Sequence, residues 1–283
     1  KYKAHTPGVD FRAERNPNYW KPGLPHIDGY QAVVMADLTK IFAAFRARQL
    51  TMTGIGRHLE RPEADILKKD FPDAVVALGP RAGWDGFVMN VSKPPFNDPR
   101  VRKAVAGYGV DRADIVKRAF LGRATPLVSV VPPGSPDYLD LNEMYPYDPN
   151  RARALLKEAG YGPDKPLTYT LLIDNSSPLF SDIATILKEQ LKRIGVAVKV
   201  EMVDRVTRIS RIAKALGEPR DYHQVISAAS TRTALDQNAY VMVTDAAWNV
   251  ANNADKKVDE LYAQWGLTLD DTKARKVAEE LQR

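Results

Sequence analysis

The sequence predicts an α/β protein, because amphipathic helices alternate with short apolar strands from Asp148 onward. Apolar residues recur at helical spacing in three segments, which are residues 38–49, 150–160 and 181–195. Runs rich in β-branched residues lie between and after them, at residues 167–174, 196–203 and 223–229. Such alternation favours a central sheet covered by crossover helices.

Two further strands are expected earlier in the chain, at residues 74–79 and 86–91. Asp148 followed by Pro149 is typical of an N-cap and first helical turn. Gly160 and Gly195 stand where helices of this kind end. The proline-rich stretch at residues 127–141 is expected to be a long surface excursion rather than a linker between domains.

Composition excludes several classes of protein. The chain has 283 residues, of which 44% are hydrophobic, and a formal net charge of +6 spread along helical segments, so no nucleic-acid partner is expected. It has no cysteine, which rules out disulfides and thiolate chemistry. Its histidines share no metal-ligand spacing, so neither a metal site nor a cofactor is expected. No catalytic motif is recognisable, and the sequence does not predict an enzyme.

The two ends of the chain suggest a fragment. Lys1 to Lys3 read like the middle of a strand, and the chain stops at Arg283 inside a helical pattern without a cap. The N-terminus lacks the apolar core of a signal peptide, and no apolar run approaches the length of a membrane span.

Four segments carry a family resemblance, and they occur in order along most of the chain. They are Phe11–Tyr30, Phe87–Val116 with its KPPFNDPRVRKAV core, Tyr147–Tyr161 and Asn252–Gln264. Together they resemble the peptide and nickel class of solute-binding proteins of ABC transporters, the family 5 extracellular proteins that include oligopeptide- and dipeptide-binding proteins.

The resemblance implies a type II periplasmic-binding-protein fold, with two lobes that close around a cleft by a hinge. Residues 1–90 would then be the C-terminal part of the first lobe. Residues 91–283 would be the second large lobe, truncated before the chain returns to the first. The segment Lys93–Val105 would form the junction between the lobes, with Asp98 and Pro99 starting a helix whose apolar stripe turns inward.

The resemblance also implies a function. The protein would capture a small peptide-like or carboxylate-bearing solute and deliver it to the permease subunits of an importer. It would work as an exported monomer in the periplasm or at the cell surface, its signal not present in this chain.

Candidate ligand residues come from the places where the chain departs from the family pattern. Arg232 stands where relatives have an aspartate that holds a peptide amine, and Arg205 stands where they often have a tryptophan. A guanidinium pairs well with a carboxylate, which favours an anionic group on the solute. Ser230 and Thr231 precede Arg232 and are also candidates. The alternative is that Arg232 pairs with Asp236, and Arg205 with Asp204 or Glu201, on the surface.

Four weaker candidates complete the site. Asn249 matches a family position that can contact ligand, and Trp248 beside it is either a cleft wall or core packing. Phe87 matches an aromatic near the cleft of relatives, although a phenylalanine that opens a strand is more often core, and Trp84 is the last candidate. Two other functions stay open: a conventional di- or oligopeptide receptor whose amine-binding acid lies elsewhere, and a sensor or enzyme that shares the fold.

Overall fold

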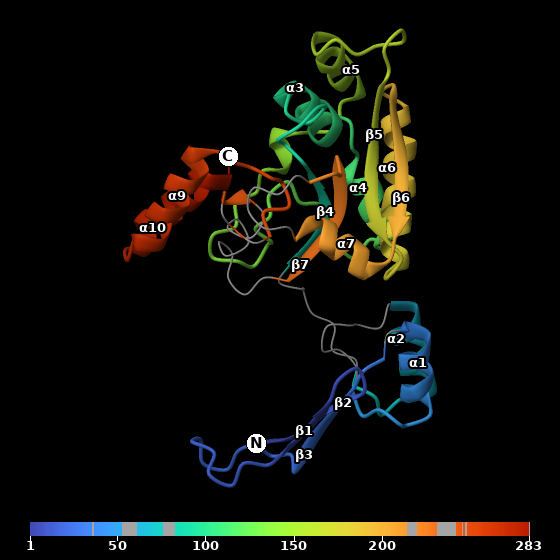
Figure 1. Ribbon diagram of the computed structural model, residues 1–283, viewed down its shortest axis with the longest axis vertical. Helices are drawn as coiled ribbons and strands as arrows, with labels where there is room; N and C mark the ends of the chain where they lie inside the picture. The colour runs from blue at the N-terminus through green and yellow to red at the C-terminus, as the bar shows by residue number, and fades with distance from the viewer. Residues whose placement is uncertain are drawn as a thin grey trace. The chain divides into compact units, whose positions relative to one another are not determined.

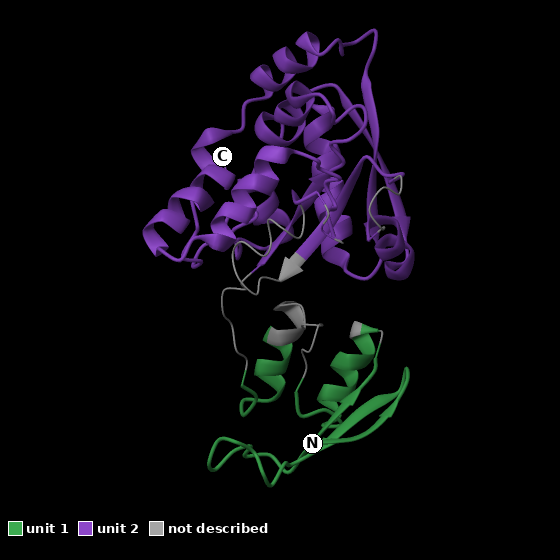
Figure 2. Cartoon of the chain, turned by 60° about the vertical axis from the view of Figure 1, so that its left-hand side comes forward, with its two compact units in different colours: residues 1–79 green, residues 80–283 purple. Residues whose placement is uncertain are grey.

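The computed structural model describes residues 1–35, 37–52, 61–75, 83–213, 220–230, 242–244, 246 and 248–282. The chain forms two compact units, Lys1–Gly79 and Pro80–Arg283 (Figure 2). The expected boundary lay later, after residue 90. The division falls earlier because the strand at Gly83–Met89 pairs along its whole length with a strand of the second unit. The assignment of these units to lobes stays a prediction.

The first unit holds a three-stranded antiparallel sheet and two helices. Its strands follow the chain in the order β1 (Tyr2–Thr6), β2 (Asp10–Glu14) and β3 (Gly29–Val33). The helices are α1 (Leu38–Arg46) and α2 (Arg61–Asp70). Asp37 caps α1 by accepting hydrogen bonds from the backbone of Thr39 and Lys40. The strand expected at residues 74–79 falls mostly outside the described residues.

The second unit is built on a four-stranded mixed sheet in the order β4-β7-β5-β6. The strands are β4 (Gly83–Met89), β5 (Leu167–Asp174), β6 (Val196–Val203) and β7 (Gln224–Ser230). β5 is parallel to both β6 and β7, whereas β4 is antiparallel to β7. The observed bounds of β5 and β6 equal those predicted.

The helices of the second unit begin where capping residues stand. Their bounds are α3 Pro99–Arg102, α4 Arg112–Ala119, α5 Pro149–Glu158, α6 Pro178–Lys192, α7 Arg205–Ile212, α9 Lys256–Leu267 and α10 Asp271–Gln282, with a π-helical turn at Lys103–Tyr108 and a 3₁₀ turn at Asn142–Met144. Asp98 caps α3 and Asp148 caps α5, each followed by proline, as the sequence indicates. Gly160 and Gly195 follow their helices with positive φ, as C-caps require.

Two apolar cores cover the two faces of the sheet. The larger one joins α6 to one face of β5 through Tyr169, Leu171 and Ile173. The smaller one joins α7 to the opposite face through Leu172 and Ile212. Successive residues of β5 from Leu171 to Ile173 therefore enter different cores, which explains why this part of the strand is apolar on both faces. Figure 1 shows α6 running alongside β5 and β6.

The segment 127–141 is more buried than expected for a surface excursion. Val131 is completely buried, and Leu141 is buried as well. Gln282 of α10 accepts a hydrogen bond from Ser129 and donates one to the carbonyl of Asp137. The excursion therefore packs against the C-terminal helix, α10.

Candidate functional site

The sheet of the second unit has a topological switch point beside β5. The chain passes from β5 through α6 to β6 on one side, then through α7 to β7 on the other side. Because these three strands are parallel, their C-terminal ends lie at one edge of the sheet. Ligands of open α/β sheets bind outside the strand ends at such a point. We call the edge of the sheet bounded by the ends of β5 and β7 and the start of α7 the switch-point crevice, after the place at which open α/β sheets bind their ligands.

The base of this crevice is a buried ion pair between Asp174 and Arg208. The β5–β7 ladder has only two pairs, Leu171 with Gln224 and Leu172 with Val225. Beyond them, Arg208 of α7 donates through Nε to the carboxylate that ends β5. Its Nη1 lies 3.5 Å from the carbonyl oxygen of Ile226 in β7. The guanidinium thus lies where the two strands separate.

Asp174 also fixes the connection from β5 to α6. Its Oδ1 accepts hydrogen bonds from the backbone N–H of Ser176, at 2.8 Å, and from the Ser176 hydroxyl. Burial of the Asp174 carboxylate acts to raise its pKa, but the hydrogen bonds from Ser176 and the charge of Arg208 outweigh burial and hold the pKa below its ordinary value. The ionised Asp174 carboxylate therefore holds both α7, through Arg208, and the connection from β5 to α6, through Ser176.

Arg205 is the first residue of α7, and its side chain is exposed. The predicted alternative partners are engaged elsewhere: Glu201 pairs with Arg211 at 2.6 Å, and Asp204 caps α7 by accepting from Thr207. Within the described part of the chain, Arg205 has no ion pair. The surface pairing considered for Arg205 is therefore not formed with these residues.

The other predicted polar residues lie at or beyond the end of β7. Ser230 is the last residue of this strand and stands opposite Gly83 in register, which places its backbone at the crevice edge. Thr231, Arg232 and the alternative partner Asp236 lie outside the described residues. Their role stays a prediction.

Trp84 and Phe87 occupy opposite faces of β4. Trp84 stands opposite Ala229, near the crevice edge, and belongs to the smaller core with 7% of its surface exposed. Its Nε1 has no hydrogen-bond partner in the described ranges. Phe87 packs against the larger core on the far face, in agreement with the core alternative.

Asn249 is buried in a loop closure. Its Nδ2 donates to the carbonyls of Thr244 and Asn253, at 3.4 and 2.7 Å, and its Oδ1 accepts from the backbone of Asn253 at 3.0 Å. Trp248 is half-buried and packs against the smaller core. The structure gives both residues a packing role, and a contact with solute stays a prediction.

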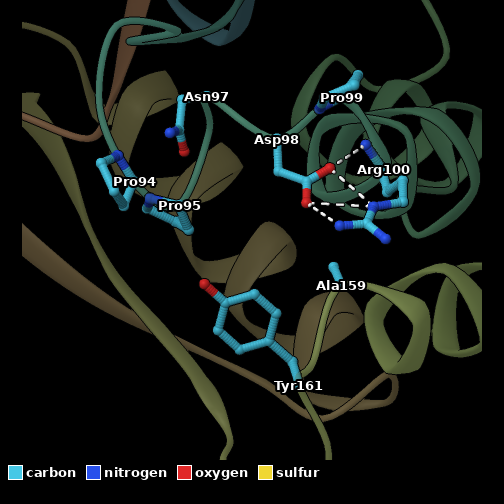
Figure 3. Close-up of a pocket in the computed structure, with 8 residues that line it drawn as sticks. All are labelled: Pro94, Pro95, Asn97, Asp98, Pro99, Arg100, Ala159 and Tyr161. Carbon is cyan, nitrogen blue, oxygen red and sulfur yellow. Dashed lines mark hydrogen bonds and ion pairs between the residues drawn. The ribbon is translucent and has the colours of Figure 1, made fainter.

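A pocket of about 590 Å³ lies at the other edge of the sheet (Figure 3). It is lined by Pro94, Pro95, Asn97, Asp98, Pro99, Arg100, Ala159 and Tyr161. Residues 94–100 follow the C-terminal end of β4, which is antiparallel to β7 and so ends away from the switch point, whereas Ala159 and Tyr161 follow α5. The Arg100 guanidinium already donates hydrogen bonds to the Asp98 carboxylate and to the Glu158 carbonyl. The strongest sequence motif thus lines a pocket, but not the switch-point crevice.

Comparison with known proteins identifies the family. Residues 1–267 match the sequence model described as bacterial extracellular solute-binding proteins, family 5, middle region. The chain belongs to this family. The predicted family and fold class are thereby confirmed.

Several family 5 relatives are similar to this chain. The glutathione-binding protein GsiB of Escherichia coli K12 is 32% identical over 208 residues, which is 72% of this chain and 38% of that protein. GsiB of Salmonella typhimurium is 32% identical over 205 residues, with the same shares. The chain therefore spans less than half the length of these curated relatives.

Solved structures share the fold. DppA of Helicobacter pylori in complex with the peptide STSA superposes with a TM-score of 0.82 at 21% identity, covering 100% of this chain and 54% of that one. AgaA of Agrobacterium tumefaciens R10 in complex with agropinic acid gives a TM-score of 0.79 at 21% identity, covering 100% and 56%. AppA of Bacillus subtilis with a nonapeptide gives 0.81 at 21% identity, covering 100% and 57%.

Sequence reasoning on this family 5 chain missed Asp174 and Arg208. Asp174 reads as an ordinary acid that ends a strand, and Arg208 as one of several arginines on a surface helix. One signal was available, because Arg208 precedes the buried Ile212 by four residues and so shares its helix face. Burial of both charges becomes visible only in the folded chain.

Proposed function

We propose that this chain is part of a receptor of an ABC importer, which captures a small solute in a cleft and presents it to the permease. Membership of family 5 supports this, since its members are binding proteins. The observation that carries the proposal is the switch-point crevice, where the exposed Arg205, the end of β7 and the Asp174–Arg208 pair meet at one edge of the sheet. The receptor binds without breaking a bond.

The solute proposed here carries at least one carboxylate. Arg205 stands in the first turn of α7, where the partial positive charge of the helix start adds to that of the guanidinium. Relatives point the same way, because GsiB is named for glutathione and AgaA was solved with agropinic acid. The candidates Arg232, Ser230 and Thr231 follow β7 and are proposed to complete the site.

Isothermal titration of the full-length gene product tests the solute class. The panel contains glutathione, agropinic acid and the peptide STSA, each beside a form whose carboxylates are converted to carboxamides. We expect binding of at least one carboxylate compound and a loss of affinity in its carboxamide form. Arg205→Gln and Arg232→Gln should weaken the carboxylate form, while Lys199→Gln, an exposed cation of β6, serves as the control.

The result that would contradict this class is equally clear. If carboxamide or cationic peptides bind as tightly as the carboxylates, and Arg232→Asp leaves that binding unchanged, the conventional peptide receptor replaces it. The AppA and DppA complexes with peptides make that outcome the relevant alternative.

Export, monomeric state and import are tested separately. Cell fractionation should recover the protein in the periplasm or at the cell surface, and light scattering should give a monomer. Deleting the gene should abolish uptake of the labelled solute. Mass spectrometry of the solute after incubation should return it unaltered; a converted product would make the protein an enzyme instead.

A further inference from the structure

Among the described residues, one terminal nitrogen of Arg208, Nη2, has no hydrogen-bond partner at the base of the switch-point crevice. Its Nε is bound by Asp174, and its Nη1 faces the Ile226 carbonyl. Nη2 makes no hydrogen bond to the residues that the structure describes. The residue as a whole is 6% exposed.

The guanidinium is held in one orientation before any solute arrives. Asp174 is completely buried and is itself held by Ser176, so it cannot follow a moving partner. On another side, the guanidinium carbon lies 5.8 Å from the ring centre of Phe180 at the start of α6. Contacts to β5, β7 and α6 thus fix the plane of the guanidinium, and a fixed donor loses little conformational freedom when it binds.

We propose that Arg208 binds the anionic group of the solute through Nη2, with Asp174 as the residue that positions it. The inference rests on the proposed function and deepens it, because it assigns the solute's charge to a residue other than Arg205 and Arg232. A carboxylate between the ends of β5 and β7 would accept from Nη2 at the point where the two strands separate.

Burial explains why Arg208 is better suited than Arg205 to discriminate between solutes. A charge-assisted hydrogen bond strengthens where water is excluded, whereas an exposed guanidinium is screened by water and salt. Arg208 is almost fully buried, and Arg205 is exposed. Because Asp174 neutralises Arg208, the unliganded crevice avoids the cost of an uncompensated buried cation. Arg205 then supplies a further positive charge at the rim.

The test compares solute affinities of variants in the full-length protein. Arg208→Met alone would leave Asp174 buried without a partner, so the double variant Asp174→Asn/Arg208→Met removes both charges together. Arg208→Lys keeps the charge but not the planar fork that serves Asp174 and the solute at once. Arg211→Gln is the matched control, since Arg211 lies on the same helix but pairs with Glu201 and Asp221.

Titrations use the carboxylate compound that the wild-type protein binds from the panel above, and its carboxamide form. The double variant should bind the carboxylate roughly 10- to 100-fold more weakly and the carboxamide as wild type does. Arg208→Lys should also lose preference for the carboxylate, and Arg211→Gln should keep it. Circular dichroism verifies that each variant is folded, and Arg208→Lys decides the matter if the double variant is not.

The outcomes separate this inference from the proposed function. Unchanged preference for the carboxylate in Arg208→Lys and the double variant, with a loss in Arg205→Gln or Arg232→Gln, would overturn the role of Arg208 and leave the anionic solute standing. Absence of any binding of the carboxylate compounds to wild type would overturn both.

Discussion

The hydroxyl of Tyr169 donates a 2.9 Å hydrogen bond to Oε1 of Gln224, and both side chains are buried. Tyr169 lies in β5 and Gln224 begins β7, so the bond joins the two strands that separate at the switch point. The other end of the amide, Nε2, has no partner in the described chain. The bond therefore joins β5 and β7 next to the two residue pairs that hold them together, and the strands separate beyond these pairs at the crevice.

Removing this hydroxyl should destabilise the second unit. Tyr169→Phe leaves the buried amide of Gln224 without its described partner, which should cost about 1–3 kcal/mol in the free energy of unfolding. Urea denaturation followed by circular dichroism measures the change. Tyr161→Phe is the control, since the Tyr161 hydroxyl makes no hydrogen bond to the residues that the structure describes. Equal stability of the two variants would contradict the role given to the Tyr169–Gln224 bond.

Acid should weaken the protein partly through Asp174. Its pKa in the folded chain is held below the unfolded value of about 3.9, because the hydrogen bonds from Ser176 and the charge of Arg208 outweigh burial. The stabilisation is fully present above that unfolded value and is lost as the pH falls through the folded pKa. Wild type should therefore lose unfolding free energy more steeply below about pH 4 than Asp174→Asn/Arg208→Met. Asp164→Asn, at an exposed position, should show the same dependence of the unfolding free energy on pH as the wild type.

Removing the cap of α5 should have a smaller, local effect. Asp148 accepts hydrogen bonds from the backbone of Asn150 and Arg151, at 3.0 and 2.9 Å. Asp148→Ala leaves these N–H groups unpaired and should cost about 1 kcal/mol. Thermal unfolding measures the loss, with Asp164→Ala as the matched removal of an exposed carboxylate. A loss shared by both variants would show that charge, not capping, is responsible.

Gly109 should not tolerate a side chain. An added Cβ would lie 2.5 Å from the carbonyl oxygen of Ala104 and 2.7 Å from Cδ1 of Ile194. Because the first contact is with backbone, Gly109→Ala should cost about 1–3 kcal/mol. Gly162→Ala meets no atom within 4 Å and is the control. Hydrogen exchange of the turn Lys103–Tyr108 should increase only in Gly109→Ala.

The pocket lined by Pro95 and Tyr161 should not bind the transported solute. It lies at the sheet edge opposite the switch point, as the antiparallel direction of β4 requires. Tyr161→Ala should leave the affinity for the panel compounds unchanged, as measured by isothermal titration. A loss of affinity comparable to that of Arg205→Gln would move the binding site to this pocket.

Local patterns were enough to predict much of the fold. The bounds of β5 and β6 follow from runs rich in β-branched and apolar residues, and the start of α5 follows from the Asp148–Pro149 pair, because strand propensity and helix capping depend on a few neighbouring residues. The family followed from four ordered segments, which the match over residues 1–267 confirms. The division into compact units, which falls before β4, depends on the pairing of β4 with β7, far along the chain.

The sequence by itself determined the elements, their caps and the family of this protein. Tertiary structure alone decided which arginine of α7 is buried. Arg205 and Arg208 lie in the same helix, but Arg205 is exposed, whereas Arg208 faces the sheet. There it forms an ion pair with Asp174, at the point where β5 and β7 separate. The spacing of Arg208 from Ile212 places it on the apolar face of α7, but it does not identify Asp174, the neutralising partner on which burial of the charge depends.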